Sequence, residues 1–172
     1  MTFPRWLGEL LGQSETEIRR LLVDPAALHF LIAWSLFESK CFAGFVKIDH
    51  LEAFAERLVR ESYQSDMTRE AAFHFHARYQ DARRKRQLMH TQPCRRMDTL
   101  LQTPFTSLRP EDQIFIVALV VYRFRNNIFH GNKGVQSWLQ FKEQIELCTE
   151  AMQGFISHAE SMNPSLKERE VA

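Results

Sequence analysis

One stretch of sequence decides the fold: Pro110–His130, which has the sequence PEDQIFIVALVVYRFRNNIFH. Its nine consecutive apolar residues, Ile114–Tyr122, fit a buried strand or a buried helix, because periodicity cannot separate the two over so short a run. A proline and two acidic residues at Pro110–Asp112 suit the first turn of a helix, and polar residues continue to His130. We therefore predict one helix over 110–130, ended by Gly131 and Gly134.

The rest of the chain also favours helices, because only six glycines and six prolines interrupt 172 residues. Helix-start patterns occur at Ser14–Glu17, at Asp24-Pro25 and at Asp49–Glu52. We expect the helix that opens at Pro25 to be central in the core, because its apolar residues, out to Phe45, cover most of its circumference. Further helices are predicted over about 51–62, 69–90, 94–102 and 135–162.

These elements predict an all-α helical bundle in which the 110–130 and 135–162 helices form an antiparallel pair. The length of the chain suits a single domain over 1–172, with a core over about 25–162 and a flexible tail over 163–172.

Composition excludes several classes of protein. The three cysteines form no disulfide framework and no CxxC pair, which favours a reducing, intracellular setting. Met1–Gly12 lacks the apolar core of a signal peptide, and the uncharged apolar stretches are shorter than a membrane span, so we expect no membrane and a cytoplasmic location. The formal charge of +1 is unevenly distributed: residues 78–98 carry seven cations against two acids, which permits a polyanionic partner.

The end of the 110–130 helix is the most informative stretch for function. Asn126 and Asn127 share a helix face with His130, whereas Arg125 lies five residues before it, about 140° away around an ideal helix. One interpretation is structural, because arginine and histidine near the C-terminus of a helix complement its dipole.

The spacing Arg125-Asn126-x-x-x-His130 also resembles the Arg-[Asn/Asp/His]-x(n)-His signature of the HEPN superfamily, all-α proteins that include many RNA-cleaving members. The preceding apolar helix, Tyr122 and the trailing Gly131 are similar to that family as well. Trp34-Ser-Leu-Phe-Glu38 is similar to a Trp-Ser-x-Phe-Glu pattern of a plasmid-associated HEPN subgroup. The resemblance covers roughly residues 25–160 and implies a HEPN-like bundle.

The resemblance implies a metal-independent endoribonuclease that uses no cofactor and brings the motifs of two protomers together in one cleft of a homodimer. His130 would serve as general base or acid for attack of a ribose 2′-hydroxyl on the adjacent phosphate. Arg125 would stabilise charge on the phosphoryl oxygens, and Asn126 would orient His130 or contact RNA. The expected products carry a 2′,3′-cyclic phosphate and a 5′-hydroxyl. Such a hydrolase would act as a toxin or defence effector, with an antitoxin or regulatory protein as a candidate partner.

Other residues are candidates for binding RNA. Lys133 precedes the last helix, whose first N–H groups can hold a phosphate, although a plain glycine-ended turn is the alternative. The run containing Arg83, Arg84 and Arg86 either follows an RNA backbone or forms a solvated face. We add Arg123 and Asn127 to this predicted substrate-binding set.

Two residues are predicted to support the site rather than react. Glu38 lies on an apolar helix and needs a partner, for which Arg123 or Arg125 is a candidate, and Tyr122 precedes the motif. No metal site is predicted, because His74 and His76 point to different helix faces and no cysteine has ligand spacing.

Two functions remain open on the sequence. The first is the dimeric ribonuclease. The second is a non-catalytic HEPN-like module that binds a nucleotide or a protein partner through the same surface.

Overall fold

The computed structural model describes residues 1–90, 92–129 and 141–163, and within these ranges it contains helices and no strand. This confirms the predicted all-α class. The α-helices of the described ranges are α1 (Phe3–Leu11), α2 (Glu15–Val23), α3 (Ala26–Cys41), α4 (Leu51–Arg60), α5 (Asp66–Arg78), α6 (Ala82–Met89), α7 (Arg95–Gln102), α8 (Pro110–Phe129) and α10 (Lys142–Met162). Two short 3-10 helices, Ile48–His50 and Phe105–Ser107, precede α4 and α8.

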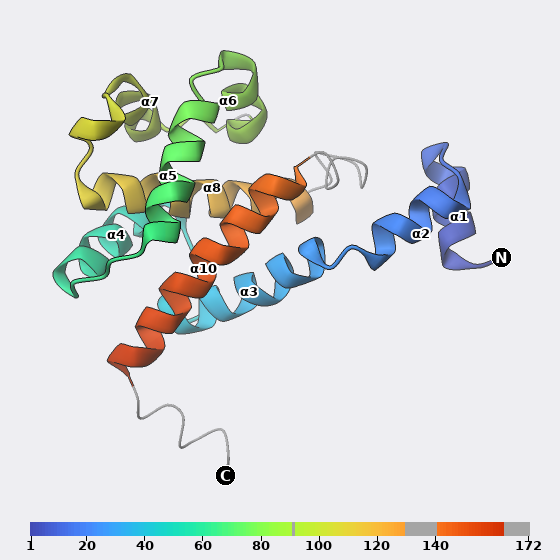
Figure 1. The fold of residues 1–172 in the computed structure, drawn as a ribbon, viewed down its shortest axis with the longest axis horizontal. Coiled ribbons are helices and arrows are strands. Elements are labelled where there is room, and N and C mark those ends of the chain that lie inside the picture. The colour runs from blue at the N-terminus through green and yellow to red at the C-terminus, as the bar shows by residue number, and fades with distance from the viewer. Residues whose placement is uncertain (91, 130–140, 164–172) are drawn as a thin grey trace, which may run out of the picture.

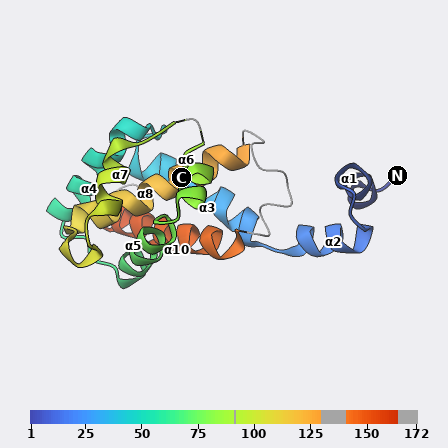
Figure 2. The same ribbon diagram turned by 90° about the horizontal axis from the view of Figure 1, so that it is seen from above.

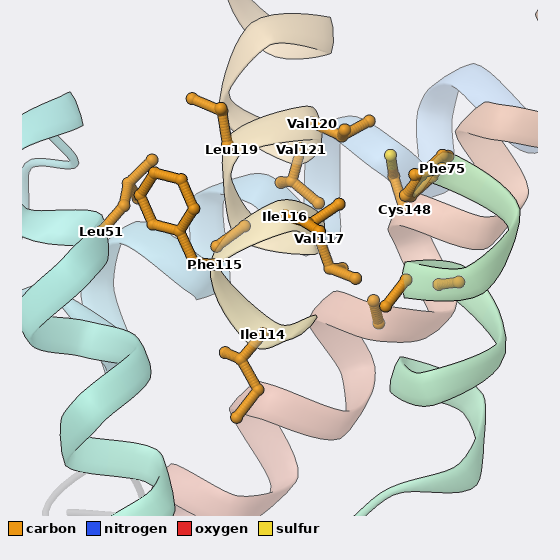
Figure 3. Packing of buried hydrophobic residues seen from close by; sticks show 14 of the residues in the cluster. Leu51, Phe75, Ile114, Phe115, Ile116, Val117, Leu119, Val120, Val121 and Cys148 are labelled. Atoms are coloured by element: carbon orange, nitrogen blue, oxygen red, sulfur yellow. The ribbon is translucent and has the colours of Figure 1, made fainter. Parts of the chain in front are cut away.

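Helix α8 is the buried centre of the bundle, as the prediction for 110–130 requires. Every residue from Ile114 to Val121 is buried. Leu51 of α4, Phe75 of α5 and Cys148 of α10 surround this run, as Figure 3 shows. A helix covered on all sides needs apolar residues all round, which explains why its sequence lacks a polar face.

Helices α3 and α10 pack along each other over most of their length and run toward the same end of the bundle, whereas α8 runs the opposite way (Figure 1). Helix α3 buries Phe30, Trp34 and Phe37 on one side only. The helix predicted to open at Pro25 is present as α3, but it is not buried all round as predicted, it ends at Cys41, and Phe45 is 78% exposed. Apolar residues occur all round α3 because its exposed face, directed away from the bundle, is apolar as well as its buried face.

The predicted helix over 69–90 is also wrong, because the structure divides this segment into α5 and α6. Ser65 caps α5 by accepting a hydrogen bond from the N–H of Thr68. Asp81 then caps α6 by accepting one from the N–H of Arg84 at 2.8 Å. An N-cap aspartate within a helical sequence pattern ends one helix and starts the next.

The first turn of α8 is held by a cluster of charged side chains. Asp112 accepts hydrogen bonds from the Arg96 guanidinium at 3.0 Å and from the Arg109 Nε at 3.1 Å. Arg96 also pairs with Glu52 of α4 and lies over the ring of Phe115, 4.8 Å from its centroid. Glu52 therefore links α4 to α7. The capping pattern predicted at Asp49–Glu52 was wrong, because the N-cap of α4 is His50, which makes no side-chain capping bond.

Helices α1 and α2 form a helical hairpin that stands away from the bundle (Figures 1 and 2). We call this hairpin, Phe3–Val23, the N-terminal arm. Together, α2 and α3 give a 27-residue stretch, Glu15–Cys41, that is long and apolar enough by composition to cross a membrane, and 28% of its most apolar window is buried. Core helices and signal sequences meet the same criterion, so this stretch alone assigns no location.

The charge cluster at the start of α8 predicts an acid-sensitive contribution to stability. Burial raises the pKa of Asp112, but hydrogen bonds from Arg109 and the charges of Arg109 and Arg96 outweigh it, so the pKa lies below its usual value. A lowered folded-state pKa stabilises the fold above the unfolded-state pKa, and the stabilisation disappears as the pH falls through the folded-state pKa. We expect Asp112→Asn to reduce the free energy of unfolding at pH 7 by about 1–3 kcal/mol.

Urea unfolding at pH 7 and in acid measures this effect. The unfolding free energies of the wild type and Asp112→Asn should converge in acid, where the wild-type carboxylate is protonated. A difference that stays constant with pH would show that the cluster does not act through this charge.

Candidate functional site

Arg125 lies near the C-terminal end of α8, where its side chain is half-buried. Its guanidinium carbon lies 5.5 Å from the ring centroid of Trp34 on α3, a cation–π contact. Its Nη1 also donates a hydrogen bond to Oδ1 of Asn126 at 3.1 Å. The guanidinium is therefore positioned by an aromatic ring and by its neighbour in the motif.

The structure brings together the two stretches that carry the sequence resemblance. Trp34 is buried on α3, and its ring lies 6.5 Å from that of Tyr122 as well as beneath Arg125. Tyr122 therefore contacts the ring that lies beneath Arg125, and its predicted supporting role stays a prediction. Trp34 lies in a sequence motif that predicts no role for it, and only its contacts with residues of α8 reveal that it positions Arg125.

The described hydrogen bond of Asn126 is with its neighbour Arg125. The prediction was that it would orient His130 or contact RNA, and its described hydrogen bond is to the guanidinium of Arg125. His130 and Lys133 lie outside the residues that the structure describes, so their predicted roles stay predictions.

Two of the predicted substrate-binding residues point into the protein. Arg123 is buried and donates from Nη1 and Nη2 to the side-chain and main-chain oxygens of Gln92, both at 2.8 Å. Asn127 is buried and donates to the carbonyl of Leu88 at 3.2 Å. These contacts fasten α6 and the segment after it to α8, which gives both residues a structural role. Burial also lowers the pKa of the Arg123 guanidinium.

Glu38 is half-buried near the end of α3, and none of the contacts described for the placed residues joins its carboxylate to Arg123 or Arg125. The hydrogen bonds described for Arg123 go to Gln92, and those described for Arg125 go to Asn126. The carbonyl of Glu38 accepts from the N–H groups of Phe42 and Gly44, which closes the last turn of α3. The predicted supporting role of the Glu38 carboxylate stays a prediction.

The predicted basic residues of α6 lie on an exposed surface beside α8. Arg83, Arg84 and Arg86 are exposed, whereas Lys85 pairs with Asp98 of α7 at 2.7 Å. Because Leu88 and Gln92 connect α6 to Asn127 and Arg123, the basic helix is tied to the half of α8 that carries Arg125. An exposed cationic helix at this end of α8 can attract a polyanion to the same end of the bundle.

Two of the cysteines and one histidine, His76, lie in the protein interior. Cys41 and Cys148 are buried, and burial raises the pKa of the Cys41 thiol to about 12. His76 contacts the carbonyls of Leu100 and Thr103, and the described residues contain no group of three histidine, cysteine or carboxylate side chains that could hold a metal ion.

The chain was compared with protein-family models, with curated proteins and with solved structures, and none of the three comparisons finds a match.

Proposed function

We propose that this chain is a metal-independent endoribonuclease whose active site combines Arg125 and His130 from two copies of the chain. The observation that carries the proposal is the contact of Arg125 with Trp34. Trp34 and Arg125 come from two stretches, 34–38 and 122–131, that resemble the same superfamily and are far apart in the sequence, and their contact supports the proposal.

The proposed reaction is an intramolecular transesterification followed by release of the 5′-hydroxyl. One imidazole accepts the proton of the ribose 2′-hydroxyl as its oxygen attacks the adjacent phosphorus. The bond to the 5′-oxygen breaks, and an imidazolium donates a proton to that leaving oxygen. Histidine suits both steps because its ordinary pKa is close to neutral. The cleaved RNA then ends in a 2′,3′-cyclic phosphate.

Arg125 has the electrostatic role in this proposal. Charge accumulates on the non-bridging phosphoryl oxygens as the 2′-oxygen attacks, and a planar guanidinium can donate two parallel hydrogen bonds to them. A guanidinium that is already oriented by Trp34 and Asn126 loses little freedom on binding, so more of its interaction energy stabilises the transition state.

The exposed cations of α6 would contribute to binding and not to chemistry. Arg83, Arg84 and Arg86 offer charges that neutralise phosphates irrespective of sequence. In this proposal they hold the RNA at the end of the bundle where α8 finishes. The proposal also includes a cytoplasmic location and a role as a toxin or defence effector, restrained by an antitoxin or regulatory partner.

Cleavage of RNA in the presence of EDTA tests the proposed function directly. We expect His130→Ala to lower kcat by about 10²–10⁴, since it removes a general acid–base, and Arg125→Ala by about 10²–10³. His50→Ala is the matched control, because His50 is an exposed histidine before α4. Mass spectrometry should find 5′ fragments that end in a 2′,3′-cyclic phosphate, which makes them lighter by one water than fragments that end in a linear 3′-phosphate.

Two results would contradict the enzyme. Wild-type protein that leaves diverse RNAs intact would favour the non-catalytic module, which would still bind a nucleotide or a protein. Cleavage that stops with EDTA, or that His130→Ala leaves unchanged, would assign the activity to another site or to a contaminant.

The contact between Trp34 and Arg125 yields a separate prediction. We expect Trp34→Leu to lower kcat roughly tenfold, because it removes a cation–π contact worth about 0.5–2 kcal/mol, whereas Trp34→Phe keeps a ring and most of the activity. Phe30→Leu is the control, because Phe30 is a buried aromatic residue of the same helix.

Thermal unfolding of all three variants separates stability from catalysis. A loss of kcat in Phe30→Leu as large as in Trp34→Leu would mean that packing of α3 in general, and not the ring beneath Arg125, is what matters.

A further inference from the structure

The N-terminal arm is a structural unit with a small core of its own. Ile18 is fully buried and Leu7 is nearly so, and the capping box of Ser14 and Glu17 starts α2. At Gly8 a Cβ atom would lie 2.7 Å from the carbonyl oxygen of Gln13, so the close approach of the chain there requires glycine. The arm is therefore a defined helical hairpin, although it stands away from the bundle.

Large apolar side chains of the arm are uncovered. Phe3, Trp6 and Leu10 are three and four residues apart and so form one face of α1, with the rings of Phe3 and Trp6 in contact at 5.4 Å. Their exposed fractions are 58%, 45% and 66%. Isolated exposed apolar residues are common, but a continuous apolar face marks an interaction surface.

Helix α3 carries a second uncovered apolar strip on the side that faces away from α10. Leu28, Ile32 and Leu36 follow one another at intervals of four residues and are 42–59% exposed. We call these three residues the α3 stripe. The exposed neighbours within this strip, Ser35 and Ser39, are uncharged, so an apolar partner that covers the strip would bury no unpaired charge there.

Within one chain, the arm and the α3 stripe are held apart. Asp24 and Pro25 alone connect α2 to α3, and Asp24 is fixed by hydrogen bonds from the Ala26 N–H at 3.0 Å and from the Lys142 ammonium at 2.8 Å. Lys142 belongs to α10, so this contact fixes the joint to the bundle while the arm projects outward (Figure 2).

We propose that the arm of one copy packs on the α3 stripe of a second copy, and that the exchange is reciprocal. A reciprocal contact has the two-fold symmetry that most soluble homodimers adopt. It would cover both apolar surfaces with residues of one sequence between Phe3 and Leu36. A standard interface takes about 800 Å² from each partner, contributed by about 20–30 residues, and a stretch of this length meets that need.

The charges of the arm favour a second copy over a membrane surface. Helices that lie on anionic membranes carry lysine and arginine on their polar face. Residues 1–24 contain three arginines and four acidic residues. Arg5 pairs with Glu9 and Arg19 with Glu15 within the arm, so its polar face is close to neutral.

The exchange would also place the partner beside the proposed active site. The arm leaves the bundle at the end where α8 finishes and α10 begins (Figures 1 and 2). This placement rests on the proposed function, whereas the contact between arm and stripe does not.

Sedimentation equilibrium of the full-length chain tests the exchange. We expect a wild-type dimer at micromolar concentration, and a loss of dimer affinity of at least 100-fold in an arm variant, Trp6→Glu/Leu10→Glu, and in a stripe variant, Ile32→Glu. The control is Phe45→Glu, which changes a more exposed apolar residue just beyond the other end of α3 and should leave the dimer intact.

Mixing the arm variant with the stripe variant separates the exchange from other dimers. The mixture retains one intact contact, the arm of the stripe variant on the stripe of the arm variant. It should therefore dimerise at concentrations where each variant alone is monomeric. Packing of arm on arm, or of stripe on stripe, would give no such rescue, and that result would overturn the proposal.

Other outcomes are equally decisive. A monomeric wild type, a dimer that both variants retain, or a monomer that binds phosphatidylcholine or phosphatidylserine vesicles through the arm would each overturn the exchange. A dimer that depends on the arm but leaves RNA intact would uphold the exchange and contradict the proposed ribonuclease. If the arm and stripe variants stay dimeric and still cleave RNA, the ribonuclease would be upheld and the exchange would be contradicted.

Discussion

The burial of α8 on all sides is the constraint on which the rest of the structure depends. Its apolar run can be covered only if α4, α5 and α10 pack around it, and the cluster at Asp112 fixes where the helix begins. Because the helix is rigid and its start is fixed, its last turns are carried to one end of the bundle. Arg125 emerges there, against Trp34 of α3. The position of the candidate site thus follows from the packing of the core.

The polar residues around that end have divided roles. Arg123 and Asn127 are buried and connect α8 to Gln92 and Leu88, whereas Arg125 lies half-buried on an aromatic ring. Neighbouring residues of one motif therefore differ in function because a helix turns each one toward a different environment. Arg123 and Asn127 hold the basic helix α6 against the same end of α8 that carries Arg125, which itself faces α3.

Much of the fold could be predicted from sequence, and the failures have physical causes. Helix α8 was predicted because its start signal and length outweighed its β-branched composition. The division at Asp81 was missed because a capping aspartate also fits a solvent-exposed helical position. Burial of Arg123 and Asn127 could not be foreseen, since their partners, Gln92 and Leu88, lie more than thirty residues away. The apolar face of α3 was assigned to the core because sequence cannot tell a buried face from one that awaits a partner.

The central claim is that two copies of the chain build one catalytic site. The most direct measurement is RNA cleavage by wild-type protein after subunit exchange with increasing amounts of a variant that lacks both motif side chains, Arg125→Ala/His130→Ala. If both copies must contribute, activity per wild-type chain falls in proportion to the fraction of wild-type chains, because mixed dimers are inactive. If each copy acts alone, activity per wild-type chain stays constant, and the account of a shared site is contradicted.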